Sequence, residues 1–135
     1  TESIVSIREK GYDAMDEYRT YENVIRSHIE YELLCQDYPY ERESLEEILF
    51  IIVDTITSHN ETVRISGDDK PAEVVKSRFM KLTKEHIEYV LQGLKDNPVK
   101  VRNIKAYLLA SLYNAPTTIS NYYTALVNHN MANGF

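Results

Sequence analysis

The side chains best suited by type and spacing to bind a ligand are lysines and arginines in the second half of the chain. Arg102 and Lys105 are three residues apart, so they share one face of a helix, and Lys100 precedes them. Lys76 and Lys81 are five residues apart, about 140° around a helix, and do not form one stripe. Cations of this kind contact phosphates without reading a base sequence. We therefore predict a DNA-binding surface at these five residues; the alternative is a solvated cationic face.

Aromatic side chains near the C-terminus form a second candidate site. The chain has 11 Tyr, 3 Phe and no Trp, and Asn121 is followed directly by Tyr122 and Tyr123. Tyrosine rings stack on nucleic-acid bases. Adjacent residues on a helix point about 100° apart, so only one of the two rings can join a core stripe. We predict that the other ring faces a partner, and we assign Asn121, Tyr122 and Tyr123 to partner binding.

Motifs for catalysis or for holding a cofactor are absent from the sequence. It lacks the glycine-rich phosphate-binding patterns and the paired histidines of zinc proteases, and its four histidines lie in separate segments. The single cysteine, Cys35, has no motif partner. The acidic run of Glu41, Glu43, Glu46 and Glu47 is typical of a helix start, where carboxylates favour the positive end of the helix dipole. We predict that the protein is not an enzyme and binds no metal and no cofactor.

The net charge of −6 combines two halves of opposite sign. Residues 1–69 hold 6 Lys and Arg against 17 Asp and Glu, a net charge of −11. Residues 70–135 hold 9 Lys and Arg against 4 Asp and Glu, a net charge of +5. Overall acidity argues against a nucleic-acid-binding protein, but the basic half permits DNA contact. The acidic half suits a basic partner, because opposite potentials speed encounter and fix register.

Helices are the elements that must position these residues. Gly and Pro number only four each, fewer than an all-β fold usually needs for its turns. Thr20 is the predicted N-cap of a first helix, which the segment 33–40 breaks. Ser44 and Glu47 have the spacing of a capping box. The helix after it is predicted to be central, with an apolar stripe of Leu45, Ile48, Leu49, Ile52 and Ile56, widened by Ile51 and Val53.

The next part of the chain predicts a short strand and then a helix. Residues 62–66 alternate in polarity and are β-branched, and Gly67-Asp68-Asp69 marks a turn. Pro71 suits the first turn of a helix, where a missing N–H costs nothing. The predicted buried side of this helix consists of Val74, Val75, Arg78, Phe79 and Leu82.

Three further helices are expected in the remaining sequence. Thr83 caps the first of them, which ends at Asn97-Pro98. A periodic apolar stripe predicts the second over 101–112, and Ala115-Pro116 breaks it. The last helix starts at Thr117 or Thr118.

Together these patterns predict an all-α fold, a compact bundle of five to six short helices with at most one short β element near 62–66. Residues 20–132 form a single helical domain, and residues 1–19 are a linker or a loosely attached helix. No apolar run approaches the roughly 20 residues of a membrane span, so no membrane contact is expected. A single cysteine indicates a reducing compartment, so we expect a cytoplasmic protein.

Four stretches of the sequence together resemble one family. They are residues 37–43 (DYPYERE), 71–82 (PAEVVKSRFMKL), 86–91 (HIEYVL) and 100–123 (KVRNIKAYLLASLYNAPTTISNYY). Over residues 20–130 the chain resembles the C-terminal domain of replication initiator protein A, found on plasmids and conjugative elements of Clostridia-like Gram-positive bacteria. The resemblance implies the C-terminal piece of a longer initiator, whose upstream winged-helix domain binds origin DNA.

Related initiators carry a DnaD-like primosome fold in this position, which is linked to loading of host helicase or primase. The resemblance therefore also implies a DnaD-like helical module. The signature of that module places Tyr, Ile and Trp four residues apart along one helix. This sequence has Tyr107 in the first position and Ser111 and Ala115 in the other two.

Two hypotheses for function follow from the resemblance and the charge pattern. In the first, the domain recruits host replication proteins (helicase, helicase loader or primase) and contacts DNA through its basic C-terminal half. In the second, it is a structural or oligomerising domain that arranges initiators at the origin without contacting DNA. The second hypothesis predicts a large self-complementary apolar surface patch.

Overall fold

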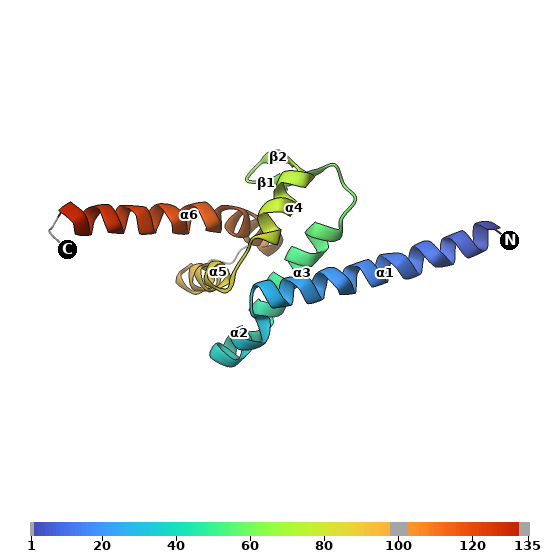
Figure 1. Cartoon of the computed structure of the whole chain (residues 1–135), viewed down its shortest axis with the longest axis horizontal. Helices are drawn as coiled ribbons and strands as arrows, with labels where there is room; N and C mark the ends of the chain where they lie inside the picture. Colours follow the sequence, from blue (N-terminus) through green and yellow to red (C-terminus); the bar gives the residue numbers. More distant parts are fainter. Residues whose placement is uncertain (1, 98–102, 133–135) are drawn as a thin grey trace.

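The computed structural model describes residues 2–97 and 103–132, and it describes side chains for 13–97, 103–120 and 126. Its elements are α1 (Glu2–His28), α2 (Tyr31–Asp37), the 3-10 turn η1 (Pro39–Glu41), α3 (Arg42–Thr57), β1 (Thr62–Ile65), β2 (Asp68–Pro71), α4 (Ala72–Met80), α5 (Lys84–Asp96) and α6 (Ile104–Ala132). This confirms the predicted helical fold with one small β element. Figure 1 shows α1 and α6, the two longest helices, extending in opposite directions from the centre of the molecule. Among the described helices, none has the length and apolarity needed to cross a membrane.

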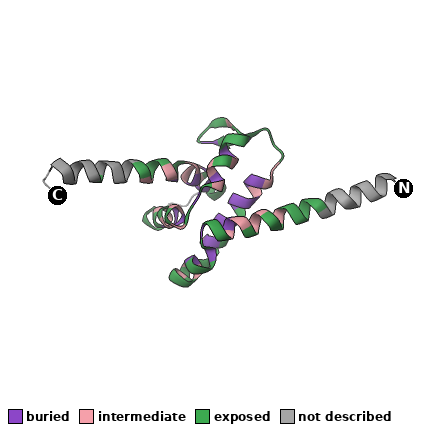
Figure 2. Cartoon of the chain, in the orientation of Figure 1, coloured by how far each residue is buried: buried purple, intermediate pink, exposed green. Residues whose placement is uncertain are grey.

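Helix α3 lies at the centre of the hydrophobic core. The predicted stripe is buried in full, comprising Leu45, Ile48, Leu49, Ile51, Ile52, Val53 and Ile56. A helix with so wide an apolar stripe needs neighbours on several sides, and only the face with Glu43, Glu46, Glu47 and Phe50 is exposed. Helix α1 packs along α3, and α4 and α6 also contact it. Figure 2 shows the buried residues gathered around this helix.

The N-terminal helix differs from the prediction at both ends. Residues 2–19 are helical and continuous with the rest of α1, so Thr20 lies inside the helix. Its hydroxyl donates to the carbonyl of Asp16 at 2.9 Å, which is a bond that threonine makes within helices and not as an N-cap. The break comes at Glu30, whose φ of 52° is left-handed, and α2 then includes residues 33–37. The predicted N-cap and the predicted break at 33–40 were therefore wrong.

The capping box predicted at Ser44 and Glu47 does not start the central helix. Helix α3 begins at Arg42, directly after the η1 turn that Pro39 opens. Ser44 therefore already lies in the first turn of α3. The η1 turn leads the chain into the helix three residues earlier than the side-chain pattern indicates, with Glu41 and not Ser44 as the N-cap.

The strand predicted at 62–66 forms, and it pairs with a second strand. β1 and β2 are antiparallel, with Val63 opposite Lys70 and Arg64 opposite Asp69. Ser66 and Gly67 form the two-residue connection with φ of 54° and 84°, and positive φ at both central residues is the feature of type I′ hairpins. The turn thus lies one residue earlier than predicted, and Asp68 and Asp69 belong to β2.

The predictions for α4 and α5 hold with two exceptions. Pro71 is the last residue of β2 and the N-cap of α4, and does not lie in the first turn of the helix. Val75, Phe79 and Leu82 are buried, but Val74 is 46% exposed and does not face the core. Thr83 is the N-cap of α5, as predicted. The Nδ1 atom of His86 accepts a hydrogen bond of 3.0 Å from the backbone N–H of Thr83, so the histidine completes the cap.

Helix α6 continues through Pro116, where the sequence predicted a break between two helices. A proline inside a helix removes one backbone hydrogen bond and costs roughly 3 kcal/mol. Leu108, Leu112 and Ala115 are fully buried on the same helix. We attribute the continuity of α6 to this apolar packing, which offsets the cost of the proline.

Candidate nucleic-acid interface

Two cations lie against one aromatic ring on the side formed by β2, α4 and α6. The guanidinium carbon of Arg78 lies 4.1 Å from the centre of the Tyr113 ring, and the Nζ atom of Lys70 lies 6.0 Å from it. Both distances are within the range of cation–π attraction. Two consecutive elements, β2 and α4, thus bring two positive charges to one ring of α6, which is distant in sequence.

Arg78 is only partly satisfied by its neighbours. It is half-buried, and its Nη2 atom donates a hydrogen bond of 2.8 Å to the hydroxyl of Thr117. Its Nε atom is buried and has no hydrogen-bond partner among the described residues. Arg78 forms no ion pair with any described carboxylate, and the sequence contains no Asp or Glu after Asp96. A partly buried charge without a counterion is costly, so an anion bound at its free donors would stabilise it.

The hairpin register places Lys70 in this cluster. Lys70 pairs with Val63 across the strands, and both are half-buried, whereas Arg64 and Asp69 are exposed. The closest carboxylate of Lys70 is that of Asp68, with Nζ and Oδ2 4.0 Å apart. At that distance on the surface such a pair contributes little, so Lys70 is available to an anion.

A second cationic group lies between the hairpin turn and the start of α6. A hollow of about 590 Å³ is lined by Arg64, Ser66, Gly67, Asn103, Lys105 and Leu109, among others. The side chain of Asn103 accepts a 3.1 Å hydrogen bond from the backbone N–H of Ala106, which caps α6. Arg64 is paired with Asp69 at 3.0 Å, and Lys105 is exposed.

The structure describes three of the five cations predicted to bind DNA and places them in three different settings. Lys105 lines the hollow, and Lys81 is exposed at the end of α4, three residues after Arg78. The Nζ atom of Lys76 instead donates to the carbonyl of Ser58 at 2.6 Å. This bond ties α4 to the loop after α3, so we give Lys76 a structural role. Lys100 and Arg102 lie outside the described residues.

The side chains of Asn121, Tyr122 and Tyr123 also lie outside the described residues, although α6 runs through them. The residues that sequence reasoning missed are Lys70, Arg78 and Tyr113. One signal for Arg78 was present, because an arginine on the predicted buried side of a helix needs a partner. No sequence spacing links Tyr113 to either cation.

The chemistry of this side is suited to phosphate contact. Arginine presents several donors in a planar fork that matches phosphate geometry. The guanidinium of Arg78 already packs on the face of the Tyr113 ring. The ring therefore positions Arg78 and does not offer that face to a base. Within the part of the chain that the structure describes, no three His, Cys, Asp or Glu side chains come together to hold a metal ion.

The fold and this site define a helical domain built around one buried helix, with a cationic side suited to phosphates. The chain belongs to a family of unknown function (DUF6017), which it matches over residues 2–134. No curated protein matches the chain, and no solved structure does.

Proposed function

We propose that this domain is a non-enzymatic module of a replication initiator. It contacts nucleic-acid phosphates with its basic side, and it recruits a host helicase, helicase loader or primase with its acidic side. The observation that carries the proposal is the pair of cations on Tyr113, neither of which has a carboxylate closer than 4.0 Å among the described residues. The likeness of residues 37–43, 71–82, 86–91 and 100–123 to replication initiator protein A supports the role in replication. That role places the protein in the cytoplasm.

Binding of labelled single-stranded and duplex oligonucleotides across a salt series tests the nucleic-acid contact. The logarithm of affinity falls with the logarithm of salt, and each lost phosphate contact reduces that slope by about 0.7–0.9. We expect the reduction for Arg78→Gln and also for Arg102→Ala and Lys105→Ala, two of the cations that the sequence predicts to contact DNA. Arg19→Gln, which changes an exposed arginine on α1, is the matched control. Absence of binding at low salt, or equal slopes for Arg78→Gln and Arg19→Gln, contradicts the proposal.

Recruitment is tested by separate pull-downs of purified helicase, helicase loader and primase. Capture of at least one is expected, and capture of none contradicts this part of the proposal. Sedimentation of the domain alone measures self-association. A stable dimer that binds neither DNA nor any of these proteins would favour the oligomerising function instead.

A further inference from the structure

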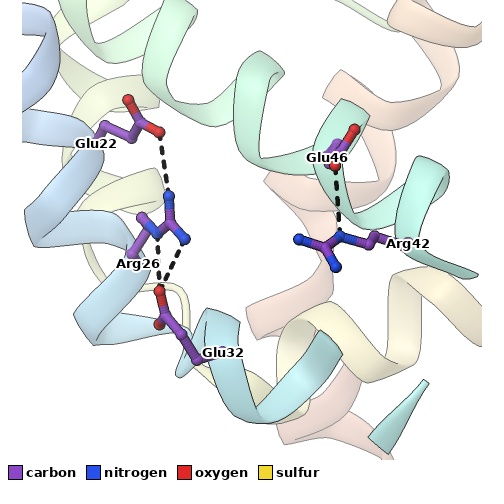
Figure 3. Close-up of polar contacts among 5 residues, drawn as sticks. All are labelled: Glu22, Arg26, Glu32, Arg42 and Glu46. Carbon is purple, nitrogen blue, oxygen red and sulfur yellow. Dashed lines mark hydrogen bonds and ion pairs between the residues drawn. The ribbon is translucent and has the colours of Figure 1, made fainter. Parts of the chain in front are cut away.

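A groove runs between α1, α2 and α3, on the acidic part of the chain. It has a volume of about 300 Å³, and its lining includes Tyr18, Arg26, Tyr31, Leu49 and Phe50. Figure 3 shows Arg26 and Arg42 pointing toward each other across this region, Arg26 joined to Glu22 and Glu32 and Arg42 to Glu46. The groove therefore combines aromatic rings with ion pairs from three helices.

The groove already holds one guanidinium group between carboxylates and a ring. The Nη2 atom of Arg26 lies 2.8 Å from Glu32, and its Nη1 atom lies 3.4 Å from Glu22. Its guanidinium carbon lies 4.8 Å from the centre of the Tyr31 ring. These contacts show that the lining stabilises a cation, because two carboxylates and an aromatic face converge on it.

Large apolar side chains are exposed beside this groove. Phe50 is 52% exposed, although it belongs to the central helix α3, whose other large apolar residues are buried. Met15 is 59% exposed on α1, the helix that packs along α3. Phe50 lines the groove, and Met15 lies three residues before Tyr18, which also lines it. Exposed apolar side chains at a groove are typical of a surface that a partner covers.

The charges around Phe50 are negative. Glu46 and Glu47 lie one turn before Phe50 on α3, and Asp54 lies one turn after it. Residues at these spacings are neighbours on the surface of a helix. The elements α3 and residues 13–28 of α1 together hold eight Asp and Glu against three Lys and Arg. Burial raises the pKa of Tyr18, and the charges of Glu22 and Asp54 raise it further, so these two carboxylates act on this ring of the groove.

We propose that this groove docks a basic amphipathic helix of a protein partner. An apolar side chain of that helix packs on Phe50 and Tyr18, and its flanking Lys or Arg side chains pair with Glu46, Glu47 and Asp54. The occupant follows from charge complementarity, since the exposed face of α3 with Phe50 at its centre and Glu46, Glu47 and Asp54 around it matches a helix with one apolar and one basic face. The arginines of the groove, Arg26 and Arg42, are already paired with Glu22, Glu32 and Glu46. The inference rests on the recruiting role proposed above, and it names the surface that performs it.

Two synthetic helical peptides of about 18 residues test the proposal, a length at which helices are stable enough to present one face. Both carry the same leucine stripe, but the polar positions are Lys in one and Glu in the other. We expect the wild-type domain to bind the Lys peptide and not the Glu peptide. Phe50→Ala and Glu47→Lys should each weaken binding about tenfold, as for residues at the centre of an interface.

Tyr89→Ala is the matched control, because Tyr89 is an aromatic residue 46% exposed on α5. Phe50 and Glu47 are both exposed, so their variants are expected to keep the wild-type circular dichroism spectrum. Unchanged affinity in Phe50→Ala overturns the proposal. Equal or tighter binding of the Glu peptide also overturns it, and would indicate that Arg26 and Arg42 take an anion.

The peptide and pull-down experiments distinguish failure of the groove proposal from failure of the replication role. If a replication protein is captured equally well by wild type and Phe50→Ala, the groove proposal is wrong and recruitment stands. If the Lys peptide binds as expected but no replication protein is captured, the groove stands and the replication role is wrong.

Discussion

The hydroxyl of Tyr38 donates a 2.5 Å hydrogen bond to the Oε2 atom of Glu88, 50 residues further along the chain. Two ion pairs flank this bond, Lys84–Asp37 at 2.8 Å and Lys95–Glu41 at 2.9 Å. All three contacts join the α2–η1 segment to α5. Polar contacts thus supplement the apolar packing that fixes α5 against the rest of the domain.

Tyr38→Phe should lower the free energy of unfolding by about 1 kcal/mol, because it removes a hydrogen bond to a carboxylate and leaves Glu88 without its donor. Thermal and urea unfolding measure the difference. Tyr40→Phe is the control, since Tyr40 is 97% exposed in the adjacent turn. A double variant with Glu88→Gln should show that the two substitutions are not additive. Equal stability of Tyr38→Phe and Tyr40→Phe would count against this role for the bond.

Stability should fall when His86 becomes protonated. Its Nδ1 atom accepts the hydrogen bond from Thr83, which a protonated ring cannot do. Burial lowers the pKa of His86 below its ordinary value of 6.5, so the unfolded chain binds the proton more tightly than the folded domain. The histidine's contribution is therefore complete above pH 6.5 and decreases as the pH falls from there through the folded-state pKa.

Melting temperatures between about pH 8 and about pH 5 measure this dependence. His86→Gln is the comparison, because glutamine accepts the same backbone hydrogen bond without titrating in this range. The wild type should lose more stability than His86→Gln over this interval. Parallel curves for the two proteins would rule out His86 as the cause.

Gly67→Ala should destabilise the hairpin by about 1 kcal/mol, because a residue with a Cβ atom is strained at positive φ. The φ of Gly67 is +84°, and a Cβ atom there would meet nothing within 4 Å, so the cost is conformational and not steric. Ser66→Gly provides the opposite test, since Ser66 also has a positive φ and glycine relieves it. Chemical denaturation of both variants checks the expected opposite signs.

Pro116→Ala should stabilise the domain by about 1–3 kcal/mol, because alanine restores the backbone N–H that proline lacks inside α6. The measurement is the urea midpoint of unfolding. Thr118→Ala, an exposed position two residues further on, is the control. Loss of stability in Pro116→Ala would show instead that the proline shapes α6 to fit its neighbours.

The parts of the fold that the sequence predicted are those where local pattern and burial agree. The stripe from Leu45 to Ile56 and the cap at Thr83 are determined by neighbouring residues, so their structure follows from short-range rules. The predictions at Thr20 and Pro116 were wrong because the local pattern there allows more than one structure. Threonine can also bond within a helix, and a proline is tolerated where the helix before it is held by buried residues such as Leu108, Leu112 and Ala115.

The candidate interface was less predictable than the fold. Lys105 was found because it belongs to a local run of cations. The cluster of Lys70, Arg78 and Tyr113 depends on the hairpin register and on how α4 packs against α6. Lys70 and Tyr113 are 43 positions apart. Helical or strand periodicity relates only residues close in sequence, so it does not predict this contact.

The separation of charge along the chain gives the folded domain an electric dipole. The hairpin and α4 lie away from α1 and α2 in Figure 1, whereas Lys84 and Lys95 of α5 are paired with Asp37 and Glu41, so the two charges are only partly separated in space. A polyanion would attract one end and repel the other, and this torque would orient the domain before contact. It would arrive with the hairpin toward the polyanion and the groove at α1–α3 facing outward. Raising the salt concentration would remove this preference along with the affinity.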